Sequence, residues 1–250
     1  MAGRLSDKVA VITGASSGQG RVAADLFARE GAHLVLADID MAGLEETRQL
    51  TRQSHMEPTL FAGDLTQEDA NREMIDLAVQ RYGRVDVLYN VAGLVRFGSV
   101  HEISLDDWNF VMQHELTITF LGCKYAVLSM MKTRSGSIIN MSSVSGLYGS
   151  PHHAAHAATK SAVAGLTKQM AVDYGPHGIR VNAIAPSQIA YGEGQRRVSA
   201  QSVLQPPTEV PLGRHAKPED TALCAVYLAS DDASFVTGQV MIIDGGTTAH

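Results

Sequence analysis

Several features that mark specialised protein classes are scarce or absent in this 250-residue chain. It has two cysteines, too few for a disulfide scaffold, and their separation fits no short-spaced metal motif. It has no excess of basic residues: the formal net charge is -6, which argues against nucleic acid as a partner. No apolar run reaches the length of a membrane helix or forms a signal-peptide core at the start. We therefore expect a cytoplasmic protein without a membrane partner.

The chain does contain enough apolar material for one large domain, since 45% of its residues are hydrophobic. Seven short apolar segments bounded by turn or polar residues resemble buried parallel strands. They cover residues 9–15, 33–38, 59–65, 85–93, 137–143, 179–186 and 239–244. Helical segments are expected between them at 18–30, 41–54, 67–82, 105–132, 152–174 and 218–229. This alternation predicts a single α/β domain over residues 1–250, a doubly wound seven-stranded parallel sheet with helices on both faces.

One segment interrupts the alternation of strands and helices. Residues 187–216 are rich in Gly, Pro, Ser and Gln and follow the sixth predicted strand. Ligands of open α/β sheets bind at the carboxyl ends of the strands, and a long insertion there is more often functional than a plain linker. We predict a substrate lid over residues 187–216, with an ordinary surface loop as the alternative.

A glycine-rich turn, TGASSGQG, follows the first predicted strand and opens a predicted helix. Glycines in this place let the backbone approach a pyrophosphate, and the helix N-terminus favours its negative charge. The next strand ends at Asp38, whose carboxylate can accept hydrogen bonds from both ribose hydroxyls of an adenosine and would repel a 2′-phosphate. No arginine follows Asp38, so the sequence predicts NAD(H) rather than NADP(H) as the cofactor.

With these motifs the chain resembles the short-chain dehydrogenase/reductase family over nearly its whole length. The glycine spacing Thr-Gly-x-x-x-Gly-x-Gly, NVAG at 90–93 and GSIINMSSVSG at 136–146 match motifs of the family. The segments RVNAIAP at 180–186 and GQVMIIDGG at 238–246 match as well. The resemblance implies a Rossmann-like fold, hydride transfer between the cofactor and a secondary alcohol or ketone, and a small-molecule substrate. It also implies a homo-oligomer, a tetramer or a dimer.

The resemblance further implies which residues line the cofactor and substrate sites. Asp64 and Leu65 stand where the family contacts adenine, and the NVAG segment lines the cofactor cleft. The predicted cofactor-binding residues are Gly14, Ser17, Gly18, Gln19, Gly20, Asp38, Ile39, Asp64, Leu65, Asn90, Ala92, Gly93, Lys160, Pro186, Ser187 and Ile189. The predicted substrate-pocket residues are Val95, Arg96, Tyr148, His152, His153 and Tyr191.

The catalytic positions depart from the family pattern. The family uses a Tyr-x-x-x-Lys pair for acid/base chemistry, a serine that orients the substrate oxygen, and an asparagine that supports the lysine through water. The resemblance places Ser143 and Lys160 at the serine and lysine positions. It places His156 where the family has tyrosine and Glu115 where it has asparagine. His156 and Lys160 are four residues apart and share one face of a helix.

The altered positions leave three hypotheses open. Imidazole can accept a proton near neutral pH, so we favour an NAD-linked alcohol dehydrogenase in which His156, paired with Glu115, is the acid/base group. The second hypothesis is an NAD-binding homologue that has lost its activity. The third is redox-neutral chemistry of the lyase or isomerase type. The neighbouring histidines fit no zinc spacing, so we predict no metal ion.

Overall fold

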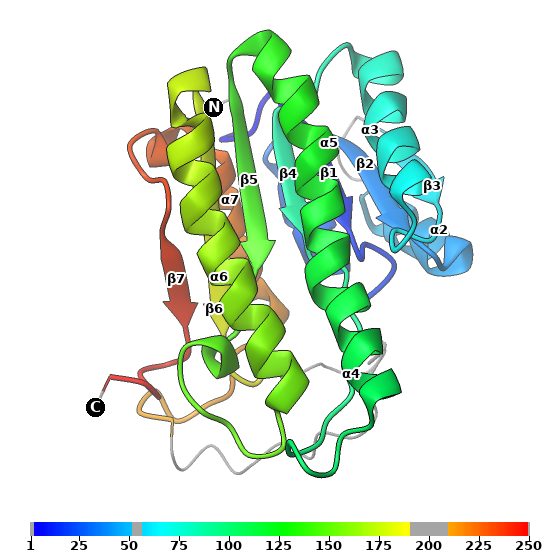
Figure 1. The fold of residues 1–250 in the computed structure, drawn as a ribbon. Coiled ribbons are helices and arrows are strands. Elements are labelled where there is room, and N and C mark those ends of the chain that lie inside the picture. Colours follow the sequence, from blue (N-terminus) through cyan, green and yellow to red (C-terminus); the bar gives the residue numbers. More distant parts are fainter. Residues whose placement is uncertain (1–2, 52–56, 191–209, 250) are drawn as a thin grey trace.

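Seven parallel strands form one sheet in the order β3-β2-β1-β4-β5-β6-β7 (Figure 1). The computed structural model describes residues 3–51, 57–190 and 210–249. The strands are β1 (Val9–Thr13), β2 (His33–Asp38), β3 (Thr59–Ala62), β4 (Val87–Asn90), β5 (Gly136–Met141), β6 (Ile179–Pro186) and β7 (Val240–Ile243). The strand order reverses between the neighbours β1 and β4, which makes the crevice beyond their carboxyl ends the expected ligand site. The predicted sheet is confirmed.

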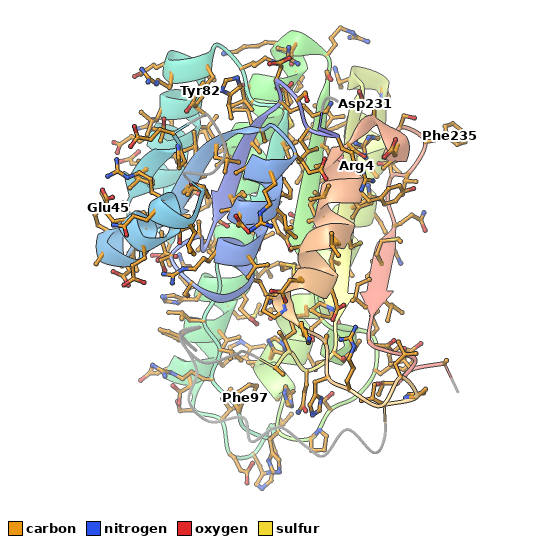
Figure 2. All side chains as sticks on the ribbon, turned by 180° about the vertical axis from the view of Figure 1, so that it is seen from behind. Arg4, Glu45, Tyr82, Phe97, Asp231 and Phe235 are labelled. Carbon is orange, nitrogen blue, oxygen red and sulfur yellow. The ribbon has the colours of Figure 1, made fainter. Side chains whose placement is uncertain are left out.

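Helices cover both faces of the sheet (Figures 1 and 2). One face carries α3 (Glu68–Tyr82), α5 (Ile118–Thr133) and α6 (Ala154–Tyr174), and the other carries α1 (Gly18–Arg29), α2 (Met41–Leu50) and α7 (Pro218–Ala229). Successive strand residues point to opposite faces, so β1 contributes side chains to the hydrophobic cluster on each face of the sheet. Ala10 and Ile12 pack in the cluster that contains Phe27, whereas Val9 and Val11 pack in the other. Burial on both sides explains why the strands are apolar throughout rather than alternating.

The helix predicted over residues 105–132 is divided by a π-helical turn. The structure has α4 (Leu105–Val111), the π turn Met112–Thr117 and then α5. The wider π turn changes which side chains face the protein interior, and such turns occur frequently at functional sites. Here it contains Glu115, which is only 4% exposed. An acidic residue is therefore directed into the molecule from the middle of a long helical segment.

The helix predicted from His152 begins two residues later. Ala154 is the first residue of α6 and His153 is its N-cap, while His152 has a left-handed φ of 60°. This start of α6 lies with α4 at the end of the molecule to which the strands point in Figure 1. Figure 2 shows Phe97 at that same end, with Arg4 and Asp231 toward the opposite end.

The region predicted as a substrate lid is described only at its two ends. Ile189 forms a bridge with Ala216, which joins those ends beside β6. Residues 191–209, which include the predicted pocket residue Tyr191, lie outside the described residues. The lid over 187–216 stays a prediction. Among the described residues, no helix is long and apolar enough to span a bilayer.

Candidate active site

The glycine-rich turn after β1 is held tightly against the loop after β4. The Thr13 hydroxyl accepts hydrogen bonds from the backbone N–H groups of Val91 and Ala92 at 3.0 and 3.1 Å. Gly14 has a φ of +68°, and a Cβ there would lie 2.9 Å from the Ala92 backbone. A Cβ on Gly20 would overlap the carbonyl oxygen of Gly14. This close packing of backbone on backbone requires glycine at both positions and places the turn at the N-terminus of α1, a cradle that fits a pyrophosphate.

Asp38, at the carboxyl end of β2, faces this turn. Its carboxylate accepts hydrogen bonds from the backbone N–H groups of Ser16 and Asp40, each at 3.1 Å. A carboxylate has lone pairs beyond these two bonds, so it can also accept from ribose hydroxyls. Arg21, the cation that bonds to the Ser16 carbonyl, is paired with Glu46 at 2.8 Å. The Asp38 carboxylate therefore keeps acceptor capacity at the carboxyl end of β2, beside the glycine-rich turn.

The other predicted cofactor residues belong to the same end of the sheet. Asp64 accepts hydrogen bonds from the Thr66 hydroxyl and backbone, which lower its pKa. The Asn90 amide donates to Asn140 at 3.0 Å and so ties β4 to β5. Gln19 accepts a bond from Thr221, which links α1 to α7. The remaining members lie at the start of α1, at the end of β6, or after β2, β3, β4 and β6: Ser17, Gly18, Ile39, Leu65, Gly93, Pro186, Ser187 and Ile189.

Three predicted catalytic residues meet at the Glu115 carboxylate. Both carboxylate oxygens lie 2.9 Å from Nδ1 of His156. Oε1 also lies 3.4 Å from Nζ of Lys160, a residue that is 7% exposed. Oε2 accepts a 2.6 Å hydrogen bond from the hydroxyl of Thr159. The π turn and α6 together thus build a buried network around one carboxylate.

The electrostatics of this network keep the carboxylate ionised. Burial alone raises the pKa of Glu115. The positive charge of Lys160 and the hydrogen bonds from His156 and Thr159 outweigh burial and lower the pKa to about 2. Glu115 is therefore an anion throughout the physiological range, and its charge is balanced by the neighbouring ammonium of Lys160.

The contact with Glu115 determines how the His156 ring is used. An ionised carboxylate only accepts hydrogen bonds, so Nδ1 of His156 must carry the proton. Among the residues that the structure describes, Nε2 has no hydrogen-bond partner, and the side chain is 16% exposed. The ring thus presents the lone pair of Nε2 away from the buried network. A general base needs such an accessible nitrogen.

Lys160 and Ser143 complete the predicted set. Nζ of Lys160 donates to the Met141 carbonyl at 3.0 Å. An ammonium has three N–H donors, so Lys160 keeps further donors beside the bond to Met141, while Glu115 at 3.4 Å is its ion-pair partner. Ser143 follows β5 and is half-buried, and its Oγ accepts from the backbone N–H of Ser145 at 3.2 Å. The Ser143 hydroxyl keeps its own proton for another acceptor.

Aromatic side chains surround the exposed edge of His156. The Phe97 ring packs edge-on against His153 at 4.7 Å and against His156 at 6.3 Å between centroids. The His153 and His156 centroids are 5.7 Å apart. Burial lowers the pKa of His153 below the usual value of histidine. This ring is accordingly neutral at neutral pH.

The other predicted pocket residues have different surroundings. Arg96 lies 3.6 Å from Asp107 and over the Phe110 ring. The His152 ring contacts Ser99 at 3.0 Å and Glu102 at 3.1 Å, on the loop after β4. Val95 is half-buried on that loop, and Tyr148 is exposed after β5. Their membership of the substrate pocket stays a prediction.

Sequence reasoning missed two members of the site, Phe97 and Thr159. Thr159 is three residues after His156, so helical spacing alone could have placed its hydroxyl beside the acid/base pair. Phe97 has no comparable signal, because its contacts depend on how the loop after β4 folds back onto α6. Within the described residues, no group of three or more His, Cys, Asp or Glu side chains is arranged to hold a metal ion.

Comparisons with known proteins agree with this architecture. The profile of the family described as enoyl-(acyl carrier protein) reductase matches residues 14–248. A 3-oxoacyl-(acyl-carrier-protein) reductase from Thermotoga maritima is 38% identical, over 97% of this chain and 98% of that protein. The 2-(S)-hydroxypropyl-CoM dehydrogenase 3 of Xanthobacter autotrophicus is 37% identical, over 100% of each. The structure of an NAD+-bound xylitol dehydrogenase superposes with a TM-score of 0.88 at 31% identity, covering 97% and 99% of the two chains. Matches of this identity across almost the full length show that the chain belongs to the short-chain dehydrogenase/reductase family of oxidoreductases.

Proposed function

We propose that this protein interconverts a secondary alcohol and a ketone with NAD(H), using His156 rather than tyrosine as its acid/base group. The observation that carries the proposal is the contact of Nδ1 of His156 with both oxygens of Glu115 at 2.9 Å. That contact sets the tautomer in which Nε2 is a proton acceptor. Two relatives named as a dehydrogenase or a reductase, with 37% and 38% identity, support this reaction class.

The chain's residues have separate roles in this proposal. When bound, the nicotinamide exchanges a hydride with the substrate carbon. The Ser143 hydroxyl donates a hydrogen bond to the substrate oxygen and so orients the substrate. Nε2 of His156 removes the alcohol proton, and Glu115 stabilises the imidazolium that forms, as a carboxylate does for other catalytic histidines. In ketone reduction the same proton returns from Nε2 to the oxygen. An N–H of Lys160 that is not bound to Met141 is available to a cofactor ribose hydroxyl.

We propose NAD(H) as the cofactor, with Asp38 as the residue that selects it. Its carboxylate would repel a 2′-phosphate, and Arg21 is already paired with Glu46. A neighbour in the structure comparison, xylitol dehydrogenase, was solved with NAD+ bound. The glycine cradle at Gly14 and Gly20 supports a dinucleotide of either kind, so the choice of NAD(H) rests on Asp38.

Incubation with NAD+ and a panel of secondary alcohols is expected to give substrate-dependent NADH absorbance. The same panel with NADP+ should give kcat/KM values at least about tenfold lower, since one charge repulsion of about 1.4 kcal/mol is a factor of ten. Asp38→Ala should narrow this difference, and Asp40→Ala serves as a control because it removes a nearby carboxylate at the start of α2. Equal use of both cofactors by the unmodified protein would refute the role of Asp38.

The two other hypotheses give different results in the same assay. A homologue without activity would bind NAD+, detected by titration, and turn over no alcohol or ketone in the panel. A redox-neutral enzyme would convert its substrate, detected by chromatography, with no net change in NADH. A substrate-dependent rise in NADH absorbance excludes both.

We also propose that the protein is a homo-oligomer. Large apolar side chains are exposed on two separate parts of the surface, one on α5 and α6 and one on α7 and β7. They include Phe120, Leu128, Val172, Leu223 and Ile242. Two such surfaces suit a tetramer with twofold symmetry better than a dimer, which needs only one. Light scattering on the purified protein is expected to give the mass of four chains; the mass of one chain would refute the proposal.

A further inference from the structure

We propose that Thr159 is a positioning residue for the acid/base pair: its hydroxyl holds the Glu115 carboxylate in the orientation that fixes the His156 ring. The inference rests on the proposed function, because it gives Thr159 a role only if His156 transfers protons. Neither the motifs in the sequence nor the matched relatives assign this residue a part in the reaction.

The contacts of Glu115 divide unequally between its two oxygens. Oε1 faces the Lys160 ammonium at 3.4 Å, while Oε2 is held by the Thr159 hydroxyl at 2.6 Å. Nδ1 of His156 lies between them, 2.9 Å from each. Lys160 attracts the carboxylate at one oxygen and Thr159 restrains it at the other. The symmetric contact with the imidazole is therefore the result of two opposed partners.

The Thr159 hydroxyl is well placed to restrain the carboxylate. Its side chain is 0% exposed, so water does not compete for the bond. The hydroxyl also lies 2.9 Å from the carbonyl oxygen of His156, one helical turn earlier. A hydroxyl has a single proton and can donate to only one of these acceptors. A hydrogen bond to an ionised group is the stronger one, so the proton goes to Glu115.

Loss of this hydroxyl would release one side of the carboxylate. Oε2 would lose its charge-assisted bond in a buried place where no solvent replaces it. The carboxylate would then be free to turn toward the Lys160 ammonium, and the bond to Nδ1 of His156 would weaken. A ring displaced by about 1 Å is enough to cost on the order of a hundredfold in rate. The rate of the chemical step should fall, whereas the affinity for the cofactor should not change.

Thr159→Val removes the hydroxyl with almost no change of shape, and Thr159→Ser keeps the hydroxyl on a smaller side chain. For Thr159→Val we expect kcat to fall about ten- to a hundredfold, with the dissociation constant of NAD+ unchanged within about twofold. Thr159→Ser should recover most of the rate. The matched control is Thr119→Val, since Thr119 is also buried but donates to the backbone carbonyl of Glu115 at 2.8 Å, not to its carboxylate. It should leave kcat within about twofold.

A second readout is independent of turnover and cofactor. In protein labelled with ¹⁵N-histidine, the Nδ1–H proton of His156 should give a low-field signal typical of a bond to a carboxylate. That signal should move or broaden in Thr159→Val and persist in Thr159→Ser and Thr119→Val. An unchanged signal together with unchanged kcat in Thr159→Val would overturn the inference.

The two readouts separate failure of this inference from failure of the proposed function. If the unmodified protein turns over no substrate, the proposed function fails, and the NMR comparison still tests whether Thr159 positions the ring. If Thr159→Val does not fold, as judged by its melting transition, Thr159→Cys replaces the hydroxyl by a weaker donor in a similar volume. For Thr159→Cys, kcat and the His156 Nδ1–H signal should lie between the values of the unmodified protein and those expected when the bond to Glu115 is lost. Unchanged kcat and an unchanged signal in this variant would overturn the proposal.

Discussion

Replacing His156 by alanine is expected to lower kcat for alcohol oxidation roughly a hundred- to ten-thousandfold, the range that a positioned acid/base group contributes. Nε2 is the accessible nitrogen of a ring whose other nitrogen is bound to Glu115, so no neighbouring group can take its place in the same geometry. The measurement is the initial rate of NADH formation as a function of pH. Unchanged turnover would remove His156 from the mechanism.

Two controls separate the chemistry of His156 from its packing. His156→Gln retains an N–H that can donate to Glu115, but it has no nitrogen that titrates near neutral pH. It should therefore be as inactive as His156→Ala while melting closer to the unmodified protein. Imidazole added to the buffer can enter the space left in His156→Ala and restore part of the rate. NAD+ binding should stay within about threefold in both variants, because the glycine cradle lies on other elements.

The sheet was predictable from the sequence because each strand has its own local signal. Short apolar runs bounded by turn or polar residues mark all seven strands, and β2 (His33–Asp38) and β6 (Ile179–Pro186) have the predicted limits. Other strands are shorter than predicted, as in β4, which covers Val87–Asn90 rather than 85–93. In β4 the surplus residues 85–86 precede the strand, and 91–93 belong to the loop at its carboxyl end, where pairing stops and the site begins.

The π turn Met112–Thr117 was not predictable, because its cause lies elsewhere in the chain. No residue type in this segment marks a wider turn. The turn is stabilised through the contacts of Glu115 with His156, Thr159 and Lys160, all of them on α6. A helix read from local spacing alone is regular through this point, and only the folded chain shows that Glu115 is directed inward.

The buried network joins the two predicted catalytic positions that depart from the family pattern, 115 and 156. A tyrosine and an asparagine need no buried anion, whereas a histidine that gains a proton leaves a positive ring beside the Lys160 ammonium. Glu115 offsets that repulsion, since its carboxylate contacts both cations. We infer that the residues at 115 and 156 depend on each other and that a change at either position alone is unfavourable.

Glu115→Gln is accordingly expected to lower kcat roughly a hundred- to ten-thousandfold, as when the carboxylate partner of another catalytic histidine becomes an amide. The amide can offer its NH₂ group to Nδ1 of His156, which would place the proton on Nε2 and occupy the base. The variant also leaves Lys160 buried without its anion, a loss on the order of 3 kcal/mol in unfolding free energy. Activity assays and denaturant titrations measure the two effects separately.

The pH dependence of stability gives Glu115 a signature of its own. Its pKa is lowered to about 2 in the folded protein, against a usual value of 4.5. The folded state therefore binds fewer protons between these values than the unfolded state does. The stabilisation is complete above about pH 4.5 and is lost as the pH falls toward 2. The unfolding free energy of Glu115→Gln should decline less steeply across this interval, and an identical slope would contradict the assignment.

Restoring the residues that the family uses tests the dependence between the two positions. Glu115→Asn alone should be as inactive as Glu115→Gln, because a neutral amide replaces the anion beside two cations. Adding His156→Tyr should recover a large part of the rate, since a phenol needs no carboxylate partner and reaches further toward the substrate than an imidazole does. The interaction energy from the four proteins of this cycle should then be well above zero. Additive effects of the two substitutions would show that Glu115 and His156 act independently.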